Sequence, residues 1–165
     1  MAEAKTKIER KYLAHFIDTA FSGTSPSYAR LGQDLEEYSI ELNPDVETTK
    51  NIIGNASTTV KGYEPTGSVD TYYAYEDEPL FERLSEIANE RSTGSQLKTT
   101  VVDVLLNSEG VITWAYREDV LVIPQSIGGD TGGVQIPFEI MYNGNRKKGT
   151  FDMKTKTFTE ETPAG

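Results

Sequence analysis

The chain has one histidine, His15, and any metal centre or Ser-His-Asp triad would have to be built around it. The common zinc sites need several His or Cys ligands, and this sequence contains no cysteine. A nucleophile turn of the Gly-x-Ser-x-Gly type is also missing from the sequence. We therefore interpret His15 as a structural residue and predict neither a metal site nor a catalytic triad.

Two other stretches contain residue types that bind phosphate or cations. Residues 128–133 read Gly-Gly-Asp-Thr-Gly-Gly, but they lack the Gly-Lys-Ser/Thr ending of a phosphate loop and stand between two predicted strands. We expect a mobile hairpin loop there. Residues 76–78, Glu-Asp-Glu, could bind calcium, although their spacing fits no known ligand loop. We predict that the protein is not an enzyme and binds no cofactor or metal.

The clearest predicted element is a helix over about residues 77–93. Its apolar residues recur at helical spacing and gather on one side, and charged residues take the other. Asp77 is predicted to cap the first turn, Pro79 suits that turn, and Gly94 permits the left-handed turn that ends a helix. Because so short a helix is marginally stable alone in water, its apolar side must pack on something else, most simply a β-sheet.

Strand signals flank this helix, so the predicted fold is mainly β, a β-sandwich or barrel-like subunit with one flanking α-helix. Residues 97–106 are almost continuously apolar and predict a central strand covered on both faces. Beyond them, 111–117 and 120–123 predict two strands interrupted at Glu118-Asp119. The dipeptide Asn143-Gly144 is the strongest hairpin signal in the sequence and predicts that the strands on either side of it, 134–142 and 146–153, pair.

Residues 37–42 alternate strictly, with Glu37, Ser39 and Glu41 on one face and apolar residues on the other. This pattern predicts a strand that is buried on one side and wet and acidic on the other. Strand signals also occur at residues 58–63. The extended polar loop that follows, 44–57, is long for a compact domain, and such connections tend to be functional or mobile.

The acidic charge is concentrated in one third of the chain. The net charge is −10, and residues 34–90 contain 14 acidic side chains against three basic ones, a local balance of −11. Nucleic-acid binding through this region is excluded, because it needs Lys and Arg to replace the counterions of the phosphates. An acidic surface can still face nucleic acid if its task is to avoid adhesion.

A length of 165 residues is typical of one domain, so we expect a single domain over 1–165 with frayed ends at 1–6 and 160–165. No apolar run approaches the roughly 20 residues that span a bilayer. The charged beginning of the sequence lacks the apolar segment of a signal peptide. We therefore expect no membrane association and a protein that is made and assembled in a cytoplasm.

The order of several segments resembles a known family. The stretches 28–32 (Tyr-Ala-Arg-Leu-Gly), 40–44, 47–53 and 61–65, followed by the acidic helix and by 138–149, are similar to the major tail proteins, or tail tube proteins, of long-tailed bacteriophages and prophages of Gram-positive bacteria. The similarity covers most of the chain. Its individual motifs are soft, because structural proteins carry no catalytic signature, so the match depends on their order.

The resemblance implies a tail-tube-like fold and a subunit that self-assembles into hexameric rings, which stack into a hollow tube in the tail of the virion. The tube conducts DNA during ejection without binding it specifically. The implied partners are other copies of the chain, the tape measure, the tail terminator, and baseplate or distal tail proteins. In this family, inner strands line the channel and a long loop reaches the adjacent ring.

The family's two surfaces can be placed on this sequence. The strand at 37–42, paired with a strand near residues 58–63, would line the channel with Glu37, Ser39, Glu41 and Lys61. The polar segment would be the ring-stacking loop, with Asp45, Val46, Glu47, Lys50, Ile52, Ile53 and Asn55. An acidic wall would repel DNA within the roughly 8 Å screening length and prevent adhesion, although Lys61 weakens this expectation slightly.

Two other functions remain open from the sequence. A capsid-decoration or other virion surface protein could use the same fold and charge, but it would need no loop that reaches the next ring. The inner tube of a contractile tail or bacteriocin cannot be separated from a flexible-tail tube by sequence patterns.

Overall fold

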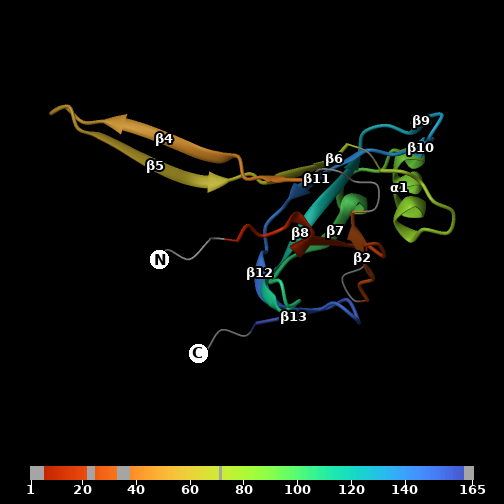
Figure 1. Ribbon diagram of the computed structural model, residues 1–165. Coiled ribbons are helices and arrows are strands. Elements are labelled where there is room, and N and C mark those ends of the chain that lie inside the picture. Colours follow the sequence, from red (N-terminus) through yellow and green to blue (C-terminus); the bar gives the residue numbers. More distant parts are fainter. Residues whose placement is uncertain (1–5, 22–24, 33–37, 71, 162–165) are drawn as a thin grey trace.

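The computed structural model describes residues 6–21, 25–32, 38–70 and 72–161. In these residues a nine-stranded sheet forms the body, one helix packs on it, and a two-stranded hairpin projects from it (Figure 1). The elements are η1 (Arg10–Tyr12), β1 (Leu13–Asp18), β2 (Tyr28–Leu31), β3 (Ile40–Glu41), β4 (Pro44–Lys50), β5 (Ala56–Tyr63), β6 (Thr66–Val69), α1 (Pro79–Glu90), η2 (Gly94–Leu97), β7 (Lys98–Leu106), β8 (Ile112–Pro124), β9 (Gly128–Asp130), β10 (Gly133–Gln135), β11 (Phe138–Tyr142), β12 (Lys147–Asp152) and β13 (Thr157–Glu160). The prediction of a mainly β fold with one helix is confirmed.

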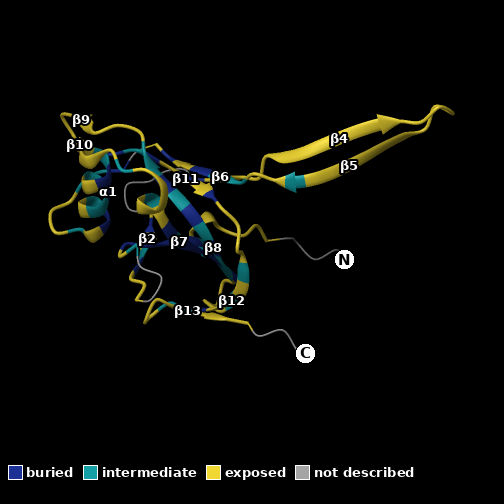
Figure 2. Cartoon of the chain, turned by 180° about the vertical axis from the view of Figure 1, so that it is seen from behind, coloured by how far each residue is buried: buried dark blue, intermediate teal, exposed yellow. Residues whose placement is uncertain are grey.

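The large sheet has the strand order β2-β1-β7-β8-β11-β6-β3, and β12 pairs with both β8 and β13. Strand β7 lies between β1 and β8 and is antiparallel to both. It is buried along most of its length (Figure 2), with Val101 in the cluster on one face and Val102 and Val104 in the cluster on the other, so both faces of this strand are covered. The predicted central strand is confirmed.

Two hydrophobic clusters fill the two faces of the sheet. On one face, Leu80 and Leu84 of α1 pack with side chains of β1, β7, β8 and β11. On the other face, Phe151 of β12 packs with β1, β2 and β7, and its ring lies 4.5 Å from that of Phe16. The helix therefore covers the sheet, as predicted, and the β12–β13 hairpin closes the opposite face.

The prediction of two short strands on either side of Glu118-Asp119 is wrong. Strand β8 runs without a break for 13 residues. Its first part pairs with β12 and its last part with β11. Glu118 is buried, and its carboxylate accepts hydrogen bonds from the Arg146 guanidinium at 2.9 Å and from the Gly144 amide at 3.2 Å. These partners offset the cost of placing a charge inside a strand.

The hairpin predicted at Asn143-Gly144 is also wrong. The strands on either side of this dipeptide, β11 and β12, both pair with β8 instead of with each other. The turn is held against Asp119, whose amide donates to Gly144 O at 3.1 Å and whose carbonyl accepts from Asn143 N at 2.7 Å. The dipeptide does make a turn, but after it the chain pairs with a different part of β8 and not with β11.

The Gly-rich stretch at 128–133 is more regular than a loop. Its residues form β9 and the beginning of β10, and Val134 lies opposite Gly129 in this short hairpin. The strand predicted over 134–142 is interrupted at Ile136 and Pro137, between β10 and β11. Across the described parts of the chain, no helix has the length and apolarity that a membrane span requires.

The helix is shorter than predicted, and its caps differ. It begins at Pro79 after Glu78, Asp77 adopts a φ of 62°, and no side chain caps the first turn. At the other end the left-handed cap is Arg91, with φ 51° and ψ 47°, whereas Gly94, which also has a positive φ of 64°, lies three residues further on at the start of η2. The amides of Arg91 and Ser92 both donate to Ile87 O, which satisfies the end of the helix.

Arg91 adopts a conformation that favours glycine, so Arg91→Gly should stabilise the protein. A side chain in the left-handed region costs roughly 1–2 kcal/mol, part of which the greater freedom of glycine in the unfolded chain offsets. We expect the free energy of unfolding to rise by about 0.5–1 kcal/mol in urea denaturation. The control Glu90→Gly, inside the helix, should lower it by about 1 kcal/mol. A loss of stability in Arg91→Gly would contradict this account of the helix end.

Candidate functional site

Strands β4 and β5 form a hairpin that projects from the body (Figures 1 and 2). We call residues 44–63 the arm. All seven residues of β4 and all but one of β5 are exposed. The prediction of an irregular loop at 44–57 is therefore wrong, as is the predicted pairing of 37–42 with 58–63. Strand β5 pairs with β4, and β3 pairs with β6.

The register gives the arm two chemically different faces. Val46 lies opposite Val60 and Thr48 opposite Thr58 on one face. Glu47 and Thr49, with their partners Thr59 and Ser57, alternate with them and lie on the other face. A bulge between Asp45 and Val46 leaves Lys61 beside this second face, where its ammonium lies 2.8 Å from the Glu47 carboxylate. The arm is a ribbon with one Val- and Thr-rich face and one charged face.

The tip of the arm presents two apolar side chains in a defined turn. Ile52 is fully exposed and Ile53 is 76% exposed. The Asn51 side chain accepts hydrogen bonds from the amides of Ile53 at 3.1 Å and Asn55 at 3.0 Å, and the Asn51 amide donates to Asn55 O. These bonds fix the turn, so the two isoleucines are held out in water.

The arm carries many of the exposed apolar side chains among the described residues. Five of the exposed large hydrophobic side chains in the described residues belong to it, namely Val46, Ile52, Ile53, Val60 and Tyr63. An isolated two-stranded hairpin is at best marginally stable in water. Exposed apolar residues concentrated in one element mark an interaction surface. The arm is therefore the strongest candidate for a functional site.

A groove of about 700 Å³ lies where the arm joins the body. It is lined by Ile40, Leu42 and Pro65 from the root of the arm and by Tyr142 and Arg146 from the sheet. Leu42 and Tyr63 are more than half exposed at this groove. The apolar surface of the arm thus continues onto the body.

The predicted acidic face is partly assembled in the structure. Ser39 and Glu41 line a hollow of about 240 Å³ together with Asp70 and Glu139. Glu37 lies outside the described residues, and Lys61 lies on the arm, paired with Glu47. The sequence analysis missed Asp70 and Glu139. Glu139 alternates with apolar Phe138 and Ile140 in the sequence, but its approach to Glu41 depends on β11 and β3 both pairing with β6.

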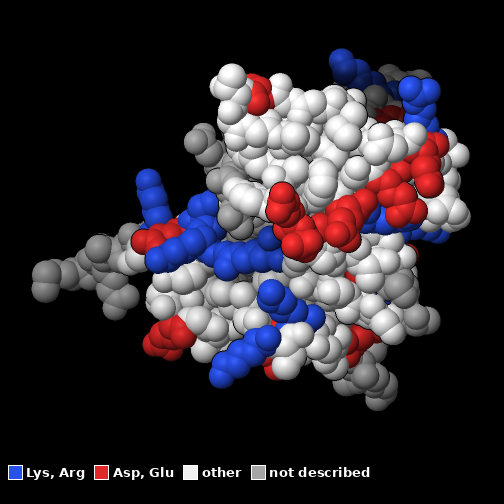
Figure 3. Space-filling model, turned by 90° about the vertical axis from the view of Figure 1, so that its right-hand side faces the viewer, with Lys and Arg blue, Asp and Glu red and all other residues white. Residues whose placement is uncertain are grey.

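A second group of acids lies on the helix. Glu82, Glu86 and Glu90 are exposed on α1, and Arg83 pairs with Glu86 at 3.2 Å. Figure 3, which views the molecule from the side on which α1 lies, shows a band of Asp and Glu with Lys and Arg beside it. The acidic surplus of residues 34–90 is therefore divided between the helix and the sheet.

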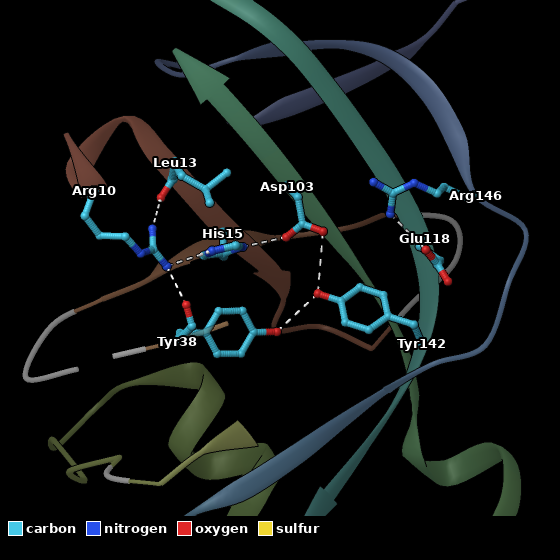
Figure 4. Close-up of polar contacts among 8 residues, drawn as sticks. All are labelled: Arg10, Leu13, His15, Tyr38, Asp103, Glu118, Tyr142 and Arg146. Atoms are coloured by element: carbon cyan, nitrogen blue, oxygen red, sulfur yellow. Dashed lines mark hydrogen bonds and ion pairs between the residues drawn. The ribbon is translucent and has the colours of Figure 1, made fainter. Parts of the chain in front are cut away.

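His15 is buried, and its imidazole Nδ1 lies 2.6 Å from Asp103 Oδ1 (Figure 4). An Asp-His pair of this kind could serve as the base of a hydrolase. However, the other ring nitrogen, where a nucleophile would have to lie, faces the Arg10 guanidinium at 3.0 Å. Within the described residues, no group of three His, Asp or Glu side chains could hold a metal ion. The geometry supports a structural role for His15.

The chain matches no protein-family model, and a search of curated proteins finds no match. Solved structures do match. The tube-terminating cap of the anti-feeding prophage has a TM-score of 0.55 at 10% identity, over 91% of this chain and 95% of that chain. The sheath/tube terminator of the extracellular contractile injection system PVC has a TM-score of 0.56 at 9% identity, over 90% of this chain and 100% of that chain.

A chain of the PVC sheath-tube complex in its extended state also matches, with a TM-score of 0.53 at 10% identity, over 86% of this chain and 90% of that chain. At these identities the comparison establishes the fold. One of these structures comes from the anti-feeding prophage and two come from an extracellular contractile injection system, and none of the three is described as a tail protein of a Gram-positive long-tailed phage. This chain therefore has the fold of tail tube and terminator components.

Gly67 is tightly enclosed, so Gly67→Ala should destabilise the body at the root of the arm. A Cβ at this position would collide with the Tyr38 ring and hydroxyl. Forcing an extra carbon into a packed site costs typically 1–3 kcal/mol. We expect a loss of this size in urea denaturation. Gly62→Ala is the matched control, because nothing lies within 4 Å of the added carbon on the arm. Equal stability of the two variants would contradict this packing.

Proposed function

We propose that this chain is a structural subunit of a phage-tail-like particle and that its arm binds neighbouring copies of the same chain. The observation that carries the proposal is the arm itself, a projecting ribbon whose Val46, Val60 and Ile52 are not covered by any of the residues that the structure describes. The fold shared with tube and terminator components supports it. A capsid-decoration protein would need no such arm.

In the form we propose, six copies make a ring and the rings stack into a hollow tube in the virion tail, assembled in the cytoplasm of the host. The ring-stacking residues are those predicted from the sequence, with Ile52 and Ile53 at the contact. Other tail components, such as a tape measure, a tail terminator and baseplate or distal tail proteins, would bind the ends or the lumen. Contact between copies stabilises the arm by removing its apolar face from water.

We further propose that the acidic hollow faces the channel. Ser39 and Glu41, with Asp70 and Glu139, present three carboxylates on one outward part of the sheet. Duplex DNA carries one charge per about 1.7 Å of its axis, and a carboxylate wall repels it at close range. Lys61 was also predicted to line the channel. It lies on the arm and pairs with Glu47, so we leave it out of the proposed lining.

A tube terminator is a second candidate. Two of the matching structures are terminators, and this chain aligns with 95% and 100% of their lengths. A terminator forms the end of a tube and does not propagate it. Electron microscopy of the purified protein separates the two candidates, since a tube subunit yields long tubes and a terminator yields single rings.

Replacing the two tip residues by Ile52→Ser with Ile53→Ser should abolish stacking. Both side chains are exposed, so the subunit should fold normally while losing the apolar contact with the next copy. We expect the assembled fraction to fall at least tenfold in sedimentation velocity, with rings or subunits replacing tubes in negative stain.

The matched control is Val111→Ser with Ile127→Ser. It removes two exposed apolar side chains elsewhere on the body, and assembly should persist. Tubes of normal length from the tip variant, or an equal loss in both variants, would refute the role of the arm tip.

Reversing charge in the acidic hollow with Glu41→Lys and Glu139→Lys should make assembled particles retain DNA. Each added cation that contacts a phosphate releases counterions, so affinity should rise at least tenfold at moderate salt and fall steeply as salt increases. A filter-binding assay with duplex DNA measures this. The control Glu82→Lys with Glu90→Lys makes the same change of charge on α1. If the control retains DNA as strongly, the hollow does not face the channel.

A further inference from the structure

A partly buried polar network joins the segment before β1 to Tyr38, which lies just before β3 (Figure 4). The Arg10 guanidinium donates to Leu13 O at 2.6 Å and to Tyr38 O at 2.8 Å, and one of its nitrogens lies 3.0 Å from His15 Nε2. On its other side, the His15 ring lies 2.6 Å from Asp103. One arginine thus holds three parts of the chain together.

The hydrogen-bonding capacity of arginine determines the state of His15. A guanidinium has donors and no acceptor, so His15 Nε2 must accept from Arg10 and cannot carry a proton. The proton of the neutral ring therefore resides on Nδ1, which donates to the Asp103 carboxylate. The observed arrangement exists only while His15 is uncharged.

The other titratable side chains around the His15 ring are two buried tyrosines, Asp103 and Tyr116. Tyr38 lies edge-on to the imidazole with ring centroids 4.6 Å apart, and its hydroxyl is 3.1 Å from that of Tyr142. Burial raises the pKa of both tyrosines, so both stay neutral. Tyr142 donates to the second Asp103 oxygen at 3.5 Å, and Tyr116 of β8 lies opposite Asp103.

The remaining neighbours are cationic. Lys11 and Arg30 line the same hollow as Arg10, a space of about 230 Å³. Lys11 is paired with Glu9 at 3.1 Å, and Arg30 donates to Lys11 O. Histidine is the side chain whose ordinary titration falls between pH 5 and 8.

We propose that protonation of His15 acts as a latch that releases Arg10, and with it the segment 6–12 and the backbone at Tyr38. A proton on Nε2 would replace an accepting lone pair by a second donor and set two cations 3.0 Å apart. Asp103 retains its bond to the charged ring, whereas Arg10 is exposed and can exchange its bond for water. The contact is present while the ring is neutral and is lost as the pH falls through its protonation.

Release of Arg10 would affect the surface proposed for assembly more than the hydrophobic core. Tyr38 directly precedes Ser39 and β3, which lead to the acidic hollow and to the arm. The buried strands β1 and β7 keep their pairing, because the His15–Asp103 bond survives. Acid should therefore loosen the edge of the subunit without unfolding it.

Imidazole NMR of the full chain tests the protonation state directly, since its single histidine gives one ring signal set. At pH 7.5 the ring nitrogens should show a proton on Nδ1 and none on Nε2. The opposite tautomer, or a doubly protonated ring at this pH, would overturn the proposal.

Hydrogen exchange read by mass spectrometry tests the release. Between pH 7.5 and pH 5, after correction for the intrinsic rate, exchange in residues 6–12 should rise at least about tenfold, the ratio given by loss of one charge-assisted hydrogen bond. The Tyr12 amide, which donates to Glu9 O, is the reporter. Exchange in β1 and β7 should stay unchanged.

Two variants make the test specific. Arg10→Ala should exchange fast in residues 6–12 at both pH values, whereas Lys11→Ala, which removes the ion pair with Glu9 and a cation–π contact with Tyr12 but no bond to His15, should keep the pH step of the wild type. A step that persists in Arg10→Ala, no step in the wild type, or a simultaneous rise in β1 and β7 would each overturn the latch. None of these outcomes depends on whether the chain forms tubes.

Discussion

A two-stranded ribbon with water on both faces is at best marginally stable by itself, and the arm of this protein is such a ribbon. The body has two filled clusters, one under α1 and one under β12–β13. The arm has none, and its strands are exposed along nearly their whole length. In the function that we propose, another copy of the chain buries Val46, Val60, Ile52 and Ile53.

The body is built to hold the root of this arm in place. Strand β6 follows the arm directly and is tied to β11, which in turn pairs with the continuous β8. Tyr38 packs over Gly67 on the inner face, and its hydroxyl reaches Tyr142. The position of the arm thus depends on close packing at one end of the sheet, and the polar network around His15 lies at that same end.

The sequence predicted the elements whose burial follows one simple period. The apolar run of β7 and the stripe with Leu80 and Leu84 were identified correctly, because each packs on a single large surface. Strand β4 was missed because both of its faces are wet, so its residues show no alternation of burial to detect. The strand near residues 58–63 was predicted, but with the wrong partner. Strand β8 was divided in two because a buried, paired Glu118 has the same sequence appearance as a loop residue.

The His15–Asp103 pair and the acidic hollow depend on long-range strand pairing, which local sequence patterns do not contain. Asp103 lies 88 residues from His15 along the chain, yet the antiparallel pairing of β1 and β7 places them opposite each other. Glu139 joins Glu41 only through β6. The resemblance to tail tube proteins located the segment that projects, although it gave that segment the wrong local structure.

The most direct measurement is a cross-link from the arm tip. Since the chain has no cysteine, Ile53→Cys carries a single benzophenone label. Particles assembled from mixed nitrogen-15 and natural-abundance subunits are then irradiated, and the joined peptides are identified by mass spectrometry. The account predicts mixed-isotope peptides that join the tip to the body of a second copy. Cross-links confined to single-isotope peptides of one chain, in particles that have assembled, would contradict it.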